Sequence, residues 1–192
     1  MIIGVDTNGA MMGERGPVSA VNCTHHWHDS ALHPADPDAV IAWEVARDRL
    51  AAATLFWAAT VRTRDGAPHV RPVLAVLIDG RLYSTTNGER AKARNLAADP
   101  RVSFATTTEE IDFIVEGTTA PVTDPGELER VAEAYRDKYG WPVTVRGSEL
   151  YAPYGAPAAG PPPYRPYVVT PDVIFGLGTS DALASRSTRW QF

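Results

Sequence analysis

The sequence predicts a mainly β fold, a small antiparallel β-barrel with peripheral helices. Three successive segments, 55–63, 68–78 and 81–85, are rich in aromatic and β-branched residues, and Asp-Gly pairs at 65–66 and 79–80 separate them. Strands joined by such tight turns must be antiparallel neighbours. Helical patterns lie before and after this meander, whereas in a parallel α/β sheet they alternate with the strands. We expect six or seven strands and two or three helices.

The remaining elements follow in chain order. A first helix is expected over 36–53, where an Asp-Pro start signal precedes apolar residues at three- and four-residue steps. A second helix, 89–98, stops at an Asp-Pro pair, and a third spans 124–140. Gly117 marks a bend in a later strand. The further strands are expected at 102–107, 112–123, 167–170 and 173–177.

Two segments show neither helical nor strand periodicity. Residues 1–34 are expected to form a poorly ordered leader, so that 36–192 is a single domain. The tyrosine- and proline-rich insert near 145–166 is expected to be a rigid, extended loop. The three histidines within 25–28 lack further ligands at metal-binding spacing, so we predict no metal site.

Composition excludes several classes of protein. The chain has 192 residues, 44% of them hydrophobic, and its longest apolar run, 73–78, is far shorter than the roughly 20 residues of a membrane span. A formal net charge of −5 argues against a nucleic-acid-binding protein. The single cysteine, Cys23, cannot form an internal disulfide, so we expect a reducing, cytoplasmic compartment.

Positive charge is concentrated in one part of this acidic chain. Residues 62–101 carry eight basic and four acidic side chains. Such a region favours an anionic ligand such as a phosphate, although solvated surface arginines explain the same count. Only two of the 18 basic residues are lysines, Lys92 and Lys138, and Lys92 falls in this region.

Three segments are candidates for a binding site. Arg71 lies inside an otherwise apolar strand and precedes Pro72. A buried guanidinium there needs an anion or a carbonyl, and the alternative is an arginine that reaches water beside an edge proline. Strand-end hydroxyls and basic side chains at the start of the next helix suit a phosphate, or else belong to an ordinary helix cap. These residues are Ser84, Thr85, Thr86, Arg90 and Lys92. The aromatic C-terminus, 188–192, docks either at a site or on the chain's own core.

In this order, the motifs resemble the split-barrel flavoproteins of the pyridoxamine 5′-phosphate oxidase-like superfamily, and most closely its flavin and deazaflavin (F420) oxidoreductases. The resemblance covers about residues 40–192, apart from the insert. Gln191 departs from the family pattern, in which a second arginine is common. The motifs that carry the resemblance are Trp57-Ala58-Ala59-Thr60, Pro68-His69-Val70-Arg71-Pro72-Val73, Tyr83-Ser84-Thr85-Thr86, Arg90-x-Lys92-x-x-Asn95-Leu96, Lys138-Tyr139-Gly140-Trp141 and Thr188-Arg189-Trp190-x-Phe192.

The resemblance implies a six-stranded, Greek-key-like split barrel that forms a homodimer with cofactor sites at the subunit interface. The implied cofactor is coenzyme F420 or FMN, and the implied activity is hydride transfer to or from a small conjugated organic substrate. The residues that match by position are Arg90 and Lys92 for the cofactor phosphate, with Ser84, Thr85 and Thr86; Arg71, Pro72 and Val73 for the ring; and Trp190, which approaches from the tail.

Several points stay open at this stage. The alternatives to the hydride-transferring oxidoreductase are an FMN-dependent oxidase of the vitamin B6 type and a non-catalytic flavin- or haem-binding protein. The anionic tail of F420 calls for an extended basic groove, which Arg62, Arg64 and Arg94 are able to provide. No Ser/His/Asp or Cys/His set is present, so no catalytic residue is assigned, and His69 is interpreted as structural. The insert is expected to cap the substrate pocket.

Overall fold

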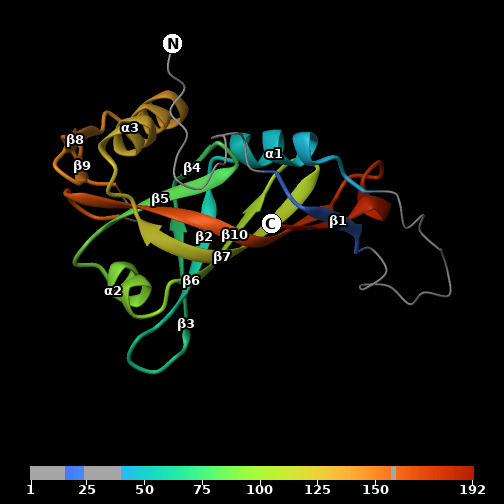
Figure 1. The fold of residues 1–192 in the computed structure, drawn as a ribbon, viewed down its shortest axis with the longest axis horizontal. Coiled ribbons are helices and arrows are strands. Elements are labelled where there is room, and N and C mark those ends of the chain that lie inside the picture. The colour runs from blue at the N-terminus through green and yellow to red at the C-terminus, as the bar shows by residue number, and fades with distance from the viewer. Residues whose placement is uncertain (1–15, 24–39, 157–158) are drawn as a thin grey trace, which may run out of the picture.

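The structure is a computed structural model that describes residues 16–23, 40–156 and 159–192. This part of the chain is mainly β, as predicted, with a large antiparallel sheet and three α-helices around it (Figure 1). The main path of the sheet runs, in spatial order, through β1 (Ser19–Asn22), β11 (Thr188–Gln191), β10 (Tyr164–Gly178), β7 (Ile111–Pro121), β6 (Arg101–Thr107), β2 (Phe56–Val61) and β3 (Pro68–Val73). The strands off this path are β4 (Ala75–Ile78), β5 (Arg81–Asn87), β8 (Thr144–Arg146) and β9 (Glu149–Tyr151).

The long strand β10 joins the two halves of the fold. Its first residues pair with β5, most of its length pairs with β7, and its C-terminal half also pairs with β11. The ladder with β7 shifts register between Pro171 and Val173. Gly117 of β7 faces this bulge, and a Cβ atom there would lie 2.1 Å from the Thr170 carbonyl oxygen. The irregularity expected at Gly117 therefore lies in the facing strand: the extra residue is in β10, β7 keeps a regular register with β6, and Gly117 is needed because a larger residue would meet the Thr170 carbonyl.

Two hydrophobic clusters stabilise the fold. The larger cluster packs α1 (Trp43–Ala52) against β2, β6, β7 and β11, and it includes Phe56 and Trp190. The second packs α3 (Pro125–Tyr139) against β4, β5 and β9, and it includes Tyr135 and Leu150. Burial of each such side chain contributes about 1.5–3 kcal/mol. Helix α2 (Ala91–Ala98) lies apart from α1 and α3, beside β2 and β5 (Figure 1).

Helix α3 begins and ends at the predicted residues. Asp124 is its N-cap, and the Oδ1 atom of this residue accepts a 2.8 Å hydrogen bond from the backbone N–H of Glu127. Gly140 ends the helix in the left-handed conformation, with φ of 60°. The Asp-Pro start and the glycine stop therefore act as the sequence indicated.

Other boundaries differ from the expectation. Helix α1 begins at Trp43, and the expected start at 36–37 lies outside the described residues. The segment 68–78 is divided at Leu74 into β3 and β4, while the two short strands expected over 167–177 are one continuous β10. The described sheet has eleven strands, more than six or seven, because elements of three or four residues carry no readable periodicity.

Two irregular segments contain strands that the sequence did not predict. Residues 19–22, within the expected leader, form β1, whose backbone pairs with β11 at the edge of the sheet; residues 1–15 and 24–34 lie outside the described part. The insert was expected to be a loop, and this was wrong for β8 and β9. They form a hairpin around Gly147, at φ of 62°, and Leu150 of this hairpin is fully buried against α3. None of the three described helices has the length and apolar composition of a membrane span.

Candidate functional site

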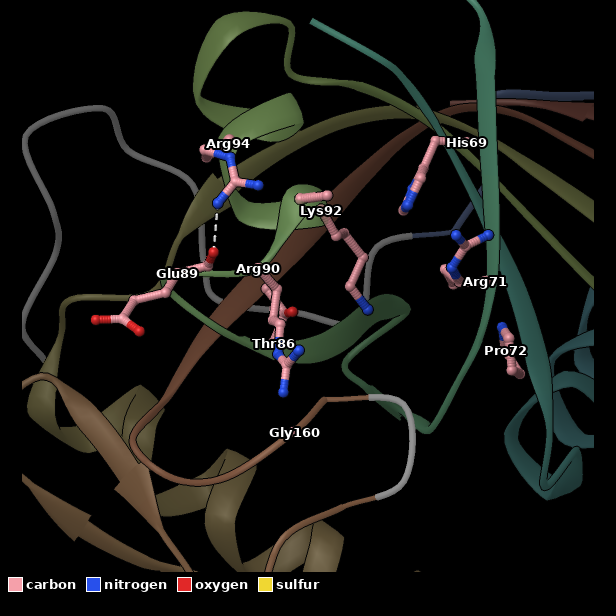
Figure 2. Close-up of a pocket in the computed structure, with 10 residues that line it drawn as sticks. His69, Arg71, Pro72, Thr86, Glu89, Arg90, Lys92, Arg94 and Gly160 are labelled. Atoms are coloured by element: carbon pink, nitrogen blue, oxygen red, sulfur yellow. Dashed lines mark hydrogen bonds between the residues drawn. The ribbon is translucent and has the colours of Figure 1, made fainter.

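A basic pocket of about 630 Å³ lies between β3, the end of β5 and the first turn of α2 (Figure 2). Its position follows from the sheet order, since β3 is the last strand on the main path and no other described strand pairs with its outer edge to close this side. The residues that line the pocket are His69, Arg71, Pro72, Thr86, Glu89, Arg90, Ala91, Lys92, Arg94 and Gly160.

Strand alternation directs Arg71 and His69 toward this pocket. Arg71 pairs with the buried Ala58 and His69 with the buried Thr60, so both side chains lie on the inner face of the sheet. Because β3 is an edge strand, the inner face is open here, and Arg71 remains exposed. Its guanidinium donates a 2.7 Å hydrogen bond to the Val70 carbonyl and forms no ion pair with a described carboxylate.

Asn95 holds α2 in place beside β2. Its amide Nδ2 donates to Thr60 Oγ1 at 3.0 Å, and its Oδ1 accepts hydrogen bonds from the backbone N–H and the hydroxyl of Thr63 at 3.3 and 3.1 Å. Asn95 follows Lys92 by three residues, so the two lie on the same buried face of the helix. This anchor keeps the Lys92 side chain directed at the sheet and not at solvent.

Lys92 is the most unusual group of the pocket. Its side chain is only 6% exposed, and its Nζ atom has no hydrogen-bond partner among the described residues. Burial lowers the pKa of the Lys92 amine to about 8. The buried hydroxyl of Thr86, which lines the same pocket, also lacks a partner. Two unsatisfied polar groups on one pocket are costly in the protein alone and are satisfied together by an anion that accepts hydrogen bonds from both.

The other charges of the pocket favour the same kind of ligand. Arg90 and Arg94 lie on the α2 side, and neither pairs with a carboxylate in the described part of the chain. Glu89 is the one acid among the lining residues, and Figure 2 shows its carboxylate pointing away from Lys92. Burial, and then the charge of Arg71, lower the pKa of His69 below its ordinary value, so the imidazole is neutral at pH 7. The site is therefore a cationic pocket with unsatisfied donors, which suits a phosphate group.

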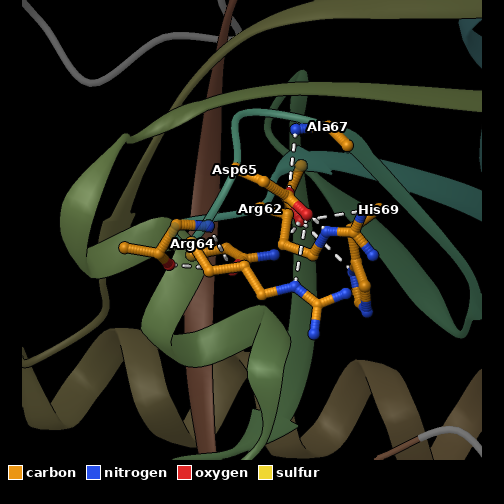
Figure 3. A network of polar contacts seen from close by, with 8 residues as sticks. Arg62, Arg64, Asp65, Ala67 and His69 are labelled. Carbon is orange, nitrogen blue, oxygen red and sulfur yellow. Dashed lines mark hydrogen bonds and ion pairs between the residues drawn. The ribbon is translucent and has the colours of Figure 1, made fainter.

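Two of the arginines expected in an extended groove are otherwise engaged. Arg62 and Arg64 both pair with Asp65, at 2.6 and 3.2 Å, in the turn between β2 and β3 (Figure 3). Hydrogen bonding to Arg62 is the main cause of the lowered pKa of the Asp65 carboxyl. Of the three arginines proposed for the groove, Arg94 alone lines the pocket.

The structure brings together most of the predicted phosphate and ring residues. Arg71, Pro72, Thr86, Arg90 and Lys92 line the basic pocket itself. The remaining strand residues do not line this pocket but line two small cavities that share Lys92 with it. Val73 and Thr85 line one of about 20 Å³, and Ser84 and Thr85 line one of about 10 Å³.

Trp190 is the predicted site residue that the structure does not place at or near the pocket. Its side chain is fully buried in the larger core cluster, with its ring 5.6 Å from that of Trp43. It lies on β11, which pairs with β1 and β10 and contributes no residue to the pocket. The C-terminal aromatic segment therefore docks on the chain's own core, which was the alternative interpretation.

Several pocket residues were not predicted. His69 lines the site although it was interpreted as structural, and Gly160 reaches it from the insert. The spacing of Asn95 from Lys92 was a usable signal for a polar anchor, because both must share one face of a short helix. Gly160 gave no such signal. In the described residues, no group of three or more His, Cys, Asp or Glu side chains is arranged to hold a metal ion, and the histidines within 25–28 lie outside that part.

Comparison with known proteins places this chain in a family. The family model described as pyridoxamine 5′-phosphate oxidase matches residues 42–176. The chain therefore belongs to the pyridoxamine 5′-phosphate oxidase family, a family of oxidoreductases with a flavin-binding fold. A curated relative, a pyridoxine/pyridoxamine 5′-phosphate oxidase of Anaeromyxobacter dehalogenans (strain 2CP-C), is 40% identical over 97 residues. That match spans 47% of this chain and only 49% of the relative.

Solved structures support the fold alone. A conserved hypothetical protein from Mycobacterium tuberculosis superimposes with a TM-score of 0.53 at 21% identity, covering 83% of this chain and 90% of that one. A NimC/NimA family protein from Clostridium acetobutylicum gives a TM-score of 0.55 at 14% identity, with coverages of 78% and 91%. A haem-binding protein from Mycobacterium smegmatis gives 0.52 at 20% identity, with coverages of 73% and 58%.

Proposed function

We propose that the chain is an oxidoreductase that binds a flavin-type cofactor, FMN or coenzyme F420, and exchanges hydride with a small conjugated organic substrate. The observation that supports this most is the buried Lys92 amine, which has no hydrogen-bond partner in the described part of the chain and lines the same pocket as Thr86, whose hydroxyl is likewise unsatisfied there. A buried, unpaired lysine is costly to keep unless a ligand uses it. The cofactor phosphate is the anion that the family assignment makes relevant.

Different residues of the chain then bind different parts of the cofactor. Lys92 and Thr86 donate hydrogen bonds to the phosphate, and Arg90 adds positive charge near it. Arg71 and Pro72 approach the ring from the edge strand, and Arg71 stabilises negative charge on it. The cofactor ring, when bound, supplies the hydride chemistry, while the protein binds and orients it.

Cofactor titration tests the proposal. Purified protein is titrated separately with FMN and with F420 while the quenching of each cofactor's fluorescence is followed. We expect saturable binding of one of them, weakened by added salt because the pocket is cationic. Binding of neither cofactor contradicts the proposal, and binding of haem alone would favour the non-catalytic alternative.

A second candidate function is oxidation of pyridoxamine or pyridoxine 5′-phosphate with FMN. The curated relative favours it, although the match covers about half of that protein. Formation of pyridoxal 5′-phosphate by the FMN-loaded protein would establish this activity, and F420 binding without FMN binding would exclude it.

We also propose that the protein forms a homodimer through the outer face of its sheet. A row of outward-facing residues crosses from β3 to β10, and it is largely apolar. The members of this row are Pro72, Trp57, Ala105, Ile114 and Phe175. Trp57 is 49% exposed, which is unusual for so large an apolar side chain. Pro72 belongs both to this row and to the pocket lining, so a second copy on this face would adjoin the site.

Trp57→Glu tests the dimer. Light scattering coupled to size exclusion should show a dimer for the natural protein and a monomer for Trp57→Glu, because a charge at the centre of an apolar interface is desolvated without a partner. Val45→Glu is the matched control, since Val45 is 46% exposed on α1, away from this face, and this variant should stay dimeric. A natural protein that is monomeric while it binds the cofactor contradicts this interface.

A further inference from the structure

The insert between α3 and β10 reaches the phosphate end of the basic pocket. Its residue Gly160 lines the pocket together with Arg90, Lys92 and Thr86. Figure 2 shows Gly160 facing Arg90 from the irregular segment that leads into β10. The insert therefore forms part of the pocket wall beside Arg90.

Tyr164 fixes the shape of the insert. This side chain, the first of β10, is fully buried. Its hydroxyl accepts a hydrogen bond from the backbone N–H of Ala156 at 3.1 Å and donates to the Gly160 carbonyl at 2.9 Å. Ala156 and Gly160 also exchange backbone hydrogen bonds of 3.0 and 2.8 Å. The end of the insert is therefore held as a closed unit on a buried anchor.

Asn87 connects this unit to the turn that carries the basic residues. It is buried at the end of β5, and its amide Nδ2 donates to the Pro161 carbonyl at 3.0 Å. Its backbone N–H donates to the Ala159 carbonyl at 3.3 Å. On the other side, its Oδ1 accepts from the Glu89 N–H at 2.8 Å and its carbonyl from the Arg90 N–H at 3.1 Å. One side chain thus ties the insert to the start of α2.

The Arg90 side chain lies directly against the Gly160 backbone. A Cβ atom on Gly160 would lie 2.6 Å from Arg90 Nη2 and 2.7 Å from Nε, closer than real Cβ contacts. Gly160 also has φ of 84°, in the left-handed region that favours glycine. The absence of a side chain at this position therefore allows the guanidinium to rest on the insert.

We propose that Gly160 and Asn87 are positioning residues of the anion site, and that the insert acts as a wall that holds the Arg90 guanidinium in place for the ligand's phosphate. The inference deepens the proposed function and rests on its assignment of the basic pocket to a phosphate. Gly160 acts by giving Arg90 room, and Asn87 acts by fixing the insert relative to the α2 turn. Neither residue needs a side-chain contact with the ligand.

A double-mutant cycle tests whether Gly160 acts through Arg90. Dissociation constants are measured for inorganic phosphate, by calorimetry, and for FMN and F420, by fluorescence, on Gly160→Ala, Arg90→Ala and the double variant. We expect Gly160→Ala to weaken phosphate binding about tenfold, the size of one lost hydrogen bond to a charged group, and to have no further effect when Arg90 is already alanine. A merely structural role would lower affinity equally in both backgrounds.

Gly147→Ala is the matched control for backbone strain. Gly147 has a similar positive φ, 62°, in the β8–β9 turn of the same insert, but a Cβ atom there meets nothing within 4 Å. This variant should bind phosphate like the natural protein. Asn87→Ala is the second test, because it removes the side-chain hydrogen bonds to Pro161 and from the Glu89 N–H without adding a charge beside the anion site. It should show the same dependence on Arg90, and it decides the question if Gly160→Ala does not fold.

The possible outcomes separate the two proposals. Equal weakening in both Arg90 backgrounds, less than twofold weakening by Gly160→Ala and Asn87→Ala, or no phosphate binding by the natural protein overturns the positioning role. Coupled phosphate binding without binding of FMN or F420 supports the positioning role and contradicts the proposed cofactor. Binding of FMN or F420 without coupling to Arg90 supports the proposed cofactor and contradicts the positioning role.

Discussion

Lys92→Met is expected to weaken FMN or F420 binding about 100-fold and, at the same time, to make the cofactor-free protein more stable. The loss of affinity follows because the phosphate loses its buried cation, and a hydrogen bond to a charged group contributes about 1.5–3 kcal/mol. The gain in stability follows because the Lys92 amine is buried and has no partner among the described residues. Burial lowers its pKa from 10.5 to about 8, which corresponds to a cost of about 3 kcal/mol for the charged form at pH 7.

Fluorescence titration and thermal unfolding of the same preparations check both parts of this expectation. Methionine has nearly the length of lysine and fills the space without a charge. Lys138→Met is the matched control. Lys138 is the other lysine, and burial also lowers its pKa to about 8, but its Nζ donates to the Ala75 carbonyl at 3.0 Å and lies outside the pocket. The Lys138→Met variant should bind the cofactor as tightly as the natural protein. A Lys92→Met variant that binds within threefold of the natural protein would remove Lys92 from the site.

The stability difference between Lys92→Met and the natural protein is expected to depend on pH. In the unfolded chain the Lys92 amine has its ordinary pKa of 10.5, whereas in the folded protein the pKa is about 8. Between these two values the unfolded state binds more protons, so raising the pH favours the folded natural protein. The advantage of the variant is therefore largest below pH 8 and disappears as the pH approaches 10.5.

Denaturant unfolding at several pH values between 7 and 10.5 measures this difference. The comparison with the variant is essential, because burial raises the pKa values of the Cys23 thiol and the Tyr139 hydroxyl, which lowers stability at high pH. These contributions cancel in the difference. A difference that stays constant over this range would mean that the Lys92 amine is not buried in the folded protein.

The parts of the site that the sequence predicted are local in the chain. Hydroxyls at the end of β5 and basic residues at the start of α2 are separated by a few residues, so a strand-to-helix turn brings them together wherever the rest of the chain lies. Arg71 was also predicted, because an arginine beside a proline indicates an edge strand. The structure gathers most of these residues at the pocket, while Val73, Ser84 and Thr85 line small cavities that share Lys92 with it.

The parts that the sequence did not predict depend on distant contacts. Asn87 and Pro161 are 74 residues apart, and their hydrogen bond brings Gly160 to the pocket, yet neither residue carries a local signal for it. Trp190 was assigned to the site by the family resemblance, whereas the aromatic composition of the C-terminus left open whether this segment docks at a site or on the core. The pairing of β11 with β1 and β10 places Trp190 in the core and not at the pocket, and composition alone does not predict this pairing. Periodicity likewise missed β8 and β9, which have three residues each.

The measurement that tests the central claim most directly is a crystal structure of the protein soaked with whichever cofactor binds in the titration. We predict that the phosphate lies within hydrogen-bonding distance of Lys92 Nζ and Thr86 Oγ1, with the Arg90 guanidinium beside it and still resting on Gly160. A cofactor phosphate bound elsewhere, with the Lys92 amine still buried and without a partner, would contradict the account.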